Sequence, residues 1–275
     1  MPVVLALLSS VLWGASDFLG GSAAKRLPSV VVVGLSQCAT LAVLGPLALV
    51  LGERPDHVWA AVAAGPVGLV ALGAFYAALA GGTMGVIAPI AASGAVVPVV
   101  VGLLLGEAPS SLQLAGIAVA LVGVVLASGP ELTGGASPRP LALAVVAAVG
   151  FGLVIVLVAK GSEGGSGAVV TCLLLMRLTS VVVLLLAWAV RRDPLQAERR
   201  DAGLLIAIGL GDVAANAAFA VASRSGLLSV IAVLSSLYPV VTVLLARQLL
   251  HERLRRVQVV GVVGTLVGVA LLAAG

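Results

Sequence analysis

Long apolar runs, separated by short polar connections, extend along the whole chain. An α-helix rises about 1.5 Å per residue, so about 20 apolar residues (range roughly 17–25) cross the hydrocarbon core of a membrane. The runs cover residues 2–21, 29–51, 58–80, 83–105, 112–128, 141–159, 168–190, 202–222, 227–250 and 257–274. This pattern predicts an all-α membrane protein with ten transmembrane helices.

A sequence repeat indicates how these helices are organised. Residues 107–126, moved forward by 145 positions, fall on residues 252–271 and match at eight of twenty positions. Many secondary transporters consist of two copies of a helical unit with the substrate site between them. Five helices in each half would invert the second copy. We therefore expect two inverted five-helix repeats, at residues 1–129 and 141–275, joined by a Gly-, Pro- and Ser-containing linker at 130–140.

Composition excludes a soluble protein and narrows the possible partners. Hydrophobic residues make up 61% of the 275 positions and charged residues 9%, against about 45–50% and about 25% in soluble domains. No connection is long enough to form a soluble domain, so function must reside in the helical bundle. The net charge of +4 lies beside helix ends, where it suits anionic lipid headgroups, and nothing indicates a nucleic-acid partner. His57 and His251 have no second ligand at metal spacing, so we expect no metal and no cofactor.

Basic residues are divided unevenly between the two sides of the membrane. Eleven of them lie in the odd-numbered connections, namely Lys25, Arg26, Arg139, Arg191, Arg192, Arg199, Arg200, Arg247, Arg253, Arg255 and Arg256. The even-numbered connections hold three, namely Arg54, Lys160 and Arg224. Because cytoplasmic connections are enriched in Lys and Arg, this predicts that both termini lie outside the cell.

Three ionisable residues, Asp17, Arg177 and Asp212, lie within the predicted helices. Each costs about 2.5–3.5 kcal/mol at a helix centre, so each needs a partner or a purpose. Arg177 and Asp212 either form an ion pair that joins two helices or bind a substrate directly. Asp17 has no evident basic partner at its depth. It serves proton coupling or cation recognition, or it reaches toward the helix end.

Polar and aromatic residues extend this candidate site. Asn216 lies four residues after Asp212 and shares its helix face. Ligand pockets usually have apolar and aromatic walls with a few polar groups. The aromatic residues that we expect near such a cavity are Trp13, Tyr76, Phe219 and Tyr238. For each of them, ordinary packing or a place at the membrane interface is the alternative.

Other features are interpreted as structural. Glu107 and Glu252 stand at the starts of the fifth and tenth predicted helices, where a carboxylate stabilises a helix N-terminus by about 0.3–1 kcal/mol. The fourth and ninth predicted helices are interrupted by candidate hinges, namely Pro89, Pro98 and Pro239. Gly264 and Gly268 form a small-residue face. Its partner helix lies in the same chain or in a second protomer, so a homodimer stays open.

Three stretches resemble the first, third and ninth helices of EamA-type transporters in the drug/metabolite transporter superfamily. They are residues 12–21 (LWGASDFLGG) followed by Lys25 and Arg26, residues 75–80 (FYAALA), and residues 233–241 (VLSSLYPVV) continuing to residues 249–254 (LLHERL). They occur in the family's order, and the resemblance covers the whole chain. It implies two inverted five-helix repeats and alternating access, usually for export of amino acids, metabolites or drugs and sometimes for uptake.

The chain departs from the family in three respects. Members commonly have an Arg in the second helix, where Gln37 stands here, whereas the seventh helix keeps Arg177. By spacing, Pro239 aligns with Gly94 rather than with Pro98. Members are also described with both termini in the cytoplasm, which disagrees with the count of basic residues.

These observations predict a multi-pass protein of the plasma membrane (the inner membrane of a bacterium) that acts as a secondary active transporter of small organic solutes. We expect proton-coupled efflux, since no Walker motif couples the chain to ATP. The alternatives are an uptake permease for a sugar or similar metabolite, an intramembrane enzyme and a passive channel. An enzyme is not expected, because no nucleophile and base share a motif. The candidate substrate or coupling residues are Asp17, Trp13, Gln37, Tyr76, Arg177, Asp212, Asn216 and Tyr238.

Overall fold

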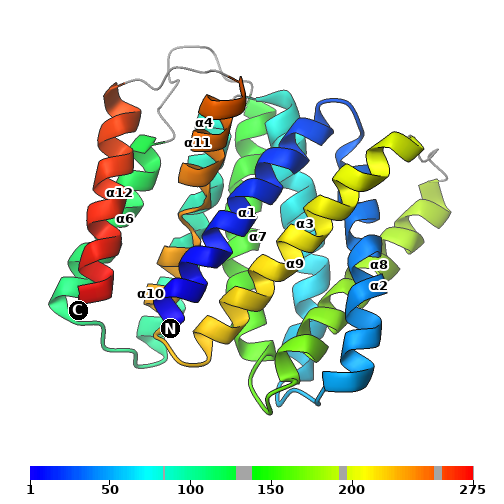
Figure 1. Ribbon diagram of the computed structural model, residues 1–275, viewed down its shortest axis with the longest axis horizontal. Coiled ribbons are helices and arrows are strands. Elements are labelled where there is room, and N and C mark those ends of the chain that lie inside the picture. The colour runs from blue at the N-terminus through cyan, green and yellow to red at the C-terminus, as the bar shows by residue number, and fades with distance from the viewer. Residues whose placement is uncertain (83, 128–137, 192–196, 251–255, 275) are drawn as a thin grey trace.

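The computed structural model describes residues 1–82, 84–127, 138–191, 197–250 and 256–274, and these residues form helices joined by short connections (Figure 1). The α-helices are α1 (Pro2–Ala24), α2 (Ser29–Leu51), α3 (Val58–Gly81), α4 (Met84–Ala92), α5 (Val96–Leu104), α6 (Ser111–Ala127), α7 (Pro138–Gly161), α8 (Ala168–Arg191), α9 (Ala202–Ser223), α10 (Leu228–Ser235), α11 (Tyr238–Leu250) and α12 (Arg256–Ala274). The described residues also form two short 3-10 helices, η1 (Ser93–Ala95) and η2 (Arg199–Asp201), and an isolated antiparallel β-bridge between Pro55 and Gly164.

In the described part of the chain, six helical segments are long and apolar enough to cross a membrane. They are Pro2–Ala24, Ser29–Leu51, Val58–Gly81, Pro138–Gly161, Ala168–Val190 and Arg199–Ser223. Shorter apolar helical stretches occupy Ile90–Leu104, Ser111–Gly123, Leu228–Thr242 and Val259–Leu272. Large apolar side chains are exposed on many of these helices, as expected where lipid replaces water. The chain is therefore an integral multi-pass membrane protein.

Two of the predicted helices are interrupted near their middles. The run at 83–105 consists of α4, η1 and α5, and the run at 227–250 consists of α10 and α11 with a turn at Ser236 and Leu237 between them. A proline removes a backbone donor and its ring crowds the carbonyl four residues earlier. Four residues before Pro98 is Gly94 in η1, and four before Pro239 is Ser235, the last residue of α10. A proline thus lies in the first turn of the helix that follows each interruption, whereas Pro46 of α2 and Pro66 of α3 lie inside continuous helices.

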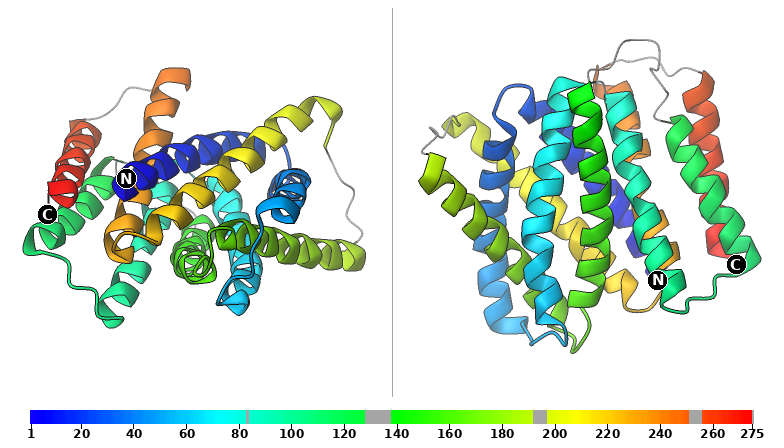
Figure 2. Two further views of the ribbon diagram at one scale, coloured as in Figure 1. Left: turned by 60° about the horizontal axis from the view of Figure 1, so that its bottom comes forward. Right: turned by 180° about the vertical axis from the view of Figure 1, so that it is seen from behind.

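The helices form a bundle in which the two halves of the chain interleave. The helices α6 and α12 pack against each other at one side of the molecule, while α2 and α8 lie at the opposite side (Figures 1 and 2). Both termini lie at the same end of the bundle (Figure 1). Helix α1 runs away from that end and α7 runs toward it, so the first helices of the two halves are antiparallel.

Contacts between the halves are reciprocal. Helix α3 packs against α7, and α9 packs against α1; likewise α3 packs against α8, and α9 against α2. The close packing of α3 on α8 and of α9 on α2 depends in each case on a glycine. A Cβ on Gly65 of α3 would meet the Met176 carbonyl of α8, and a Cβ on Gly209 of α9 would meet the Ser36 carbonyl of α2. Ser180 also donates a hydrogen bond of 2.9 Å to the carbonyl of Gly65.

The interrupted helices also pack against the opposite half of the chain. A Cβ on Gly14 of α1 would lie 2.6 Å from the Tyr238 carbonyl oxygen at the start of α11. In the other half, a Cβ on Gly152 of α7 would lie 2.6 Å from Cβ of Val97 in α5 and against the Gly94 carbonyl of η1. Each interruption is therefore packed against a glycine on the first helix of the opposite half.

Connections from the two halves also meet at each end of the bundle. At the end that carries the termini, the Asp56 N–H donates to the Glu163 carbonyl (3.0 Å), and Arg224 donates to the carbonyls of Gly164 (2.6 Å) and Gly165 (2.9 Å). At the other end, Arg26 follows α1 and lies 3.6 Å from the Asp201 carboxylate that precedes α9.

Glu107 does not cap the helix that the sequence suggested. Its carboxylate accepts the backbone N–H groups of Leu228 and Ser229, at the N-terminus of α10 in the other half. Ser110 and Gln113 instead cap α6 reciprocally, through Ser110 N–H to Gln113 Oε1 (2.9 Å) and Gln113 N–H to Ser110 Oγ (3.1 Å). Glu252, its counterpart in the repeat, lies outside the described residues.

Candidate functional site

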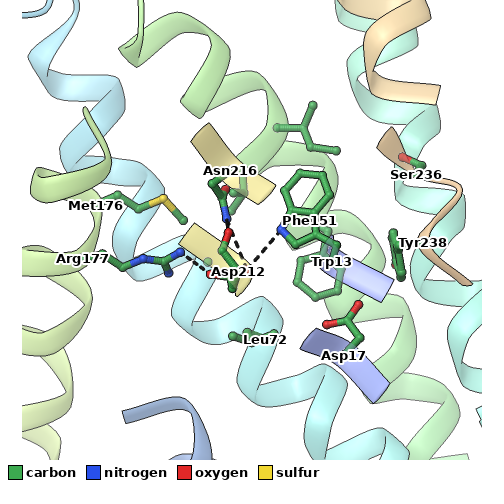
Figure 3. A pocket seen from close by; sticks show the side chains of 13 residues that line it. Trp13, Asp17, Leu72, Phe151, Met176, Arg177, Asp212, Asn216, Ser236 and Tyr238 are labelled. Atoms are coloured by element: carbon green, nitrogen blue, oxygen red, sulfur yellow. Dashed lines mark hydrogen bonds and ion pairs between the residues drawn. The ribbon is translucent and has the colours of Figure 1, made fainter. Parts of the chain in front are cut away.

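A cavity lies between the two halves, near the middle of the bundle (Figure 3). The space in it that the centre of a water molecule can reach has a volume of about 70 Å³. The cavity is lined by Trp13, Asp17, Gly68, Leu72, Phe151, Val154, Ile155, Met176, Arg177, Asp212, Asn216, Ser236 and Tyr238. These residues come from α1, α3, α7, α8, α9 and the junction of α10 with α11, so both halves of the chain build it.

Asp212 on α9 is the hub of the polar contacts. Its Oδ2 atom pairs with Arg177 of α8, and its Oδ1 atom accepts a 3.2 Å hydrogen bond from Trp13 Nε1 of α1 (Figure 3). Asn216, one turn later on α9, donates to the Asp212 carbonyl (2.8 Å) and to Oδ1 (3.3 Å). The network fixes the Asp212 carboxylate and joins α1, α8 and α9.

Arg177 is deeply buried, with a side chain only 2% exposed, and the side chain of Asp212 is 20% exposed. The guanidinium is thus held against its partner inside the bundle. Its Nε atom has no hydrogen-bond partner among the described residues. The ion pair matches one of the two sequence interpretations of Arg177 and Asp212, namely a link between helices.

Asp17 lies one turn after Trp13 on α1 and is 7% exposed. In Figure 3 its carboxylate lies between Trp13 and Tyr238, at the side of the cavity away from Arg177. The described part of the chain supplies no hydrogen bond or ion pair to this carboxylate. The hydroxyl of Tyr238 is likewise buried without a partner there. The cavity therefore holds one satisfied carboxylate and one unsatisfied carboxylate.

Six of the eight residues proposed from the sequence line this cavity: Trp13, Asp17, Arg177, Asp212, Asn216 and Tyr238. Tyr76 and Gln37 are buried but are not part of the lining. The Tyr76 ring packs over Gly20 of α1, where a Cβ would collide with its hydroxyl. Gln37 on α2 has no partner for its Oε1 atom among the described residues. Phe219 packs against Trp13, with ring centroids 6.0 Å apart.

The sequence interpretation missed the apolar wall. Phe151, Val154 and Ile155 of α7, Leu72 of α3 and Met176 of α8 line the cavity without any polar signature. Such residues resemble lipid-facing ones in a membrane helix, so their sequence alone does not mark them. Of the lining residues, Ser236 lies in the interruption before α11 and Tyr238 directly follows it, and the nearby Pro239 was the available signal there.

Comparison with known proteins assigns the chain to a family. The sequence profile of the EamA-like transporter family matches residues 1–129 and 139–274. The chain belongs to the EamA-like transporter family. The resemblance inferred from residues 12–21, 75–80 and 233–254 is therefore confirmed, and with it membership of the drug/metabolite transporter superfamily. Members of this family are membrane transporters and not enzymes.

A solved structure supports the fold. One crystal structure matches with a TM-score of 0.80 at 18% sequence identity, over 99% of this chain and 98% of that chain. At this level of identity the match establishes the fold alone. A search of curated proteins found no match. Within the described residues of this EamA-like protein, no group of three or more His, Cys, Asp or Glu residues could hold a metal ion.

Proposed function

We propose that this EamA-like protein is a secondary active transporter of the plasma membrane that exports small organic solutes in exchange for protons. The central cavity is its binding site, and Asp17 carries the proton. The observation that carries this proposal is the contrast between the two carboxylates. Asp212 is paired with Arg177, whereas Asp17 faces the same cavity without a partner among the described residues.

The contrast matters because a buried charge must be compensated. An unpaired carboxylate in an apolar site is costly to keep ionised, and taking up a proton removes that cost. When the cavity opens to water, hydration makes release of the proton favourable again. Asp17 can therefore bind and release a proton as the cavity opens alternately to the two sides of the membrane, while Asp212 stays ionised beside Arg177.

The architecture that we propose for this cycle is ten transmembrane helices in two inverted five-helix repeats. Three observations support it: the family profile matches two successive stretches, α1 and α7 are antiparallel, and the contacts between the halves are reciprocal. The interruptions next to Pro98 and Pro239 supply points at which helices can bend. Both are packed against the opposite half, so a shift of one half against the other would move them.

Flux in reconstituted vesicles tests this function. Proteoliposomes with an acidic interior, diluted into neutral buffer, should accumulate a transported solute from a panel of labelled amino acids, sugars and organic amines. A protonophore should abolish the accumulation, and protein-free vesicles correct for passive trapping of amines. Asp17→Asn should remove the dependence on the pH gradient. Asp201→Asn, a buried acid outside the cavity, should keep it.

Two results would contradict the proposal. One is the absence of gradient-dependent accumulation for every solute in the panel. The other is wild-type accumulation by Asp17→Asn. Direction is tested separately in cells that are preloaded with the transported solute: the chain should speed its loss, whereas an uptake permease would speed its entry.

A further inference from the structure

We propose that the exported solute is a small organic cation and that it occupies the Asp17 carboxylate in alternation with the proton. This inference rests on the proposed function and names the substrate class of the same cavity. Its basis is Asp17, a residue that is 7% exposed and whose carboxylate, unpartnered within the described residues, lies beside aromatic walls.

The net charge of the cavity lining favours a cationic ligand. The cavity lining contains two carboxyl groups, Asp17 and Asp212, and one guanidinium, Arg177. With both acids ionised the lining has a net charge of −1, and Arg177 already neutralises Asp212. The remaining negative charge lies on Asp17. A cation, either a proton or a protonated or quaternary amine, is the ligand that balances it.

The surroundings of Asp17 agree with this assignment. Helix α1 packs against α2, α3, α9, α10 and α11. On the described residues of these helices, the titratable groups that interact with Asp17 are Tyr76 of α3, Asp212 of α9 and Tyr238 of α11. None of the three is basic, and α10 contains no ionisable residue. The described neighbours of Asp17 thus leave its charge for a ligand to balance.

The aromatic and aliphatic residues of the lining indicate which kind of organic cation fits the cavity. Trp13, Phe151 and Tyr238 present aromatic rings to the cavity, and the faces of such rings attract cations within about 6 Å. The rest of the lining is largely aliphatic. The cavity volume of about 70 Å³ is smaller than the roughly 150 Å³ of a cavity that holds a benzene ring, so it suits a compact solute without a ring. An amine with a short aliphatic body fits this combination.

An anionic or zwitterionic solute is disfavoured by the same contacts. Its carboxylate would need Arg177, the one basic residue among the described residues of the lining, which is already paired with Asp212. Displacing Asp212 would leave a second carboxylate uncompensated in the cavity. A neutral solute would leave Asp17 as it is and could not exchange with its proton.

Binding to the purified full-length protein tests this inference without any flux. The probes are tetramethylammonium, whose charge does not titrate, the neutral analogue tert-butanol and the anion acetate. Calorimetry between pH 6 and pH 8 should show that the cation binds more tightly as the pH rises, by up to about tenfold per pH unit, because it competes with one proton. The alcohol and the anion should bind at least about tenfold more weakly than the cation, without that slope.

Variants separate the role of the charge from folding. Asp17→Asn should weaken cation binding at least about tenfold and remove its pH dependence, whereas Asp201→Asn should change neither. If Asp17→Asn is not monodisperse in size-exclusion chromatography, Asp17→Glu takes its place and should keep the pH slope. Equal binding of the three probes, a wild-type slope in Asp17→Asn, or loss of the slope in folded Asp17→Glu would overturn the inference.

The outcomes distinguish this inference from the proposed function. Cation binding with the expected pH dependence but without gradient-driven flux would contradict the proposed transport function and support the cation site. Gradient-driven flux that is confined to neutral solutes and independent of Asp17 would support a transport function and contradict the cation site.

Discussion

Asp212 accepts hydrogen bonds from side chains on three helices, and this contact pattern is the basis for the different roles that we propose for the two acids in the cavity. An ionised carboxylate has about four acceptor positions, and Arg177, Trp13 and Asn216 occupy three of them. Asp17 has none occupied by a described residue. The difference comes from neighbours that are distant in sequence, since Trp13 and Asp212 are 199 positions apart.

Removing the charge of Asp212 should therefore destabilise the protein more than removing that of Asp17. Loss of one partner from a buried ion pair costs about 3–5 kcal/mol, because the other charge is left uncompensated. The 20% exposure of Asp212 puts the expected cost at the lower end of that range. Asp212→Asn should lower the thermal midpoint followed by circular dichroism, and Arg177→Gln combined with Asp212→Asn should restore most of the loss. A double variant no more stable than Asp212→Asn alone would show that the ion pair is not what holds these helices.

The residue types of the site were predictable from the sequence, but their contacts were not. An ionisable residue inside an apolar run is conspicuous, so Asp17, Arg177 and Asp212 were found. Periodicity along one helix, however, carries no information about which helices become neighbours. Tyr76 and Gln37 were included for that reason and are buried outside the lining, while Phe151 was overlooked.

At the scale of elements, glycines set the separation of α1 from the interrupted helix. A Cβ on Gly14 would lie 2.6 Å from both the Tyr238 carbonyl oxygen and the Val241 Cβ of α11. Gly14→Ala should therefore force α1 away from the cavity and cost about 1–3 kcal/mol, as overpacking does. Gly73→Ala on α3 is the matched control, because nothing lies within 4 Å of its added Cβ. Thermal unfolding that ranks Gly73→Ala as equal to or worse than Gly14→Ala would contradict this packing argument.

The end of α5 shows how a local motif produces a contact between the halves. Gly106 has φ +89°, and the Glu107 N–H returns to the Gly102 carbonyl at 3.0 Å, which forms a Schellman turn. The turn directs the Glu107 carboxylate to the N–H groups of Leu228 and Ser229. The sequence indicated a capping carboxylate, but the capped helix depends on tertiary packing.

Glu107→Ala should consequently loosen α10 and leave α6 intact. Loss of a capping side chain costs about 0.5–2 kcal/mol. Hydrogen exchange should become faster at the amides of Leu228 and Ser229 and stay unchanged at Gln113, whose N–H is held by Ser110. Glu53→Ala, at the same end of the bundle, serves as the control. Faster exchange in α6 with none in α10 would return Glu107 to the role that the sequence suggested.

At the scale of the whole molecule, apolar run length predicted where helices form, because crossing lipid leaves the backbone few alternatives. Each of the ten predicted runs contains described helical residues, but the runs at 83–105 and 227–250 are interrupted, and the ten-helix layout stays a proposal. The reciprocal contacts between the halves could not be predicted, since they depend on glycine faces such as Gly65 and Gly209 that have many possible partners. The membrane orientation is also a property of the whole molecule, and neither fold nor cavity determines it.

The count of basic residues predicts that both termini lie outside the cell, because eleven Lys and Arg residues belong to the odd-numbered connections of the sequence and three to the even-numbered ones, which lie at the end with the termini. Cysteine labelling in intact cells checks this in a background lacking Cys38 and Cys172. A membrane-impermeant maleimide should label Ser166→Cys, in the connection between α7 and α8 at the end with the termini, and should label Arg200→Cys, at the opposite end, only after permeabilisation. Both positions are exposed, so accessibility within the fold does not bias the comparison. The reverse pattern would place the termini in the cytoplasm, as is common in the family. The proton-coupled step that we propose for Asp17 is compatible with either pattern, because the two ends of the bundle would only exchange their inner and outer roles.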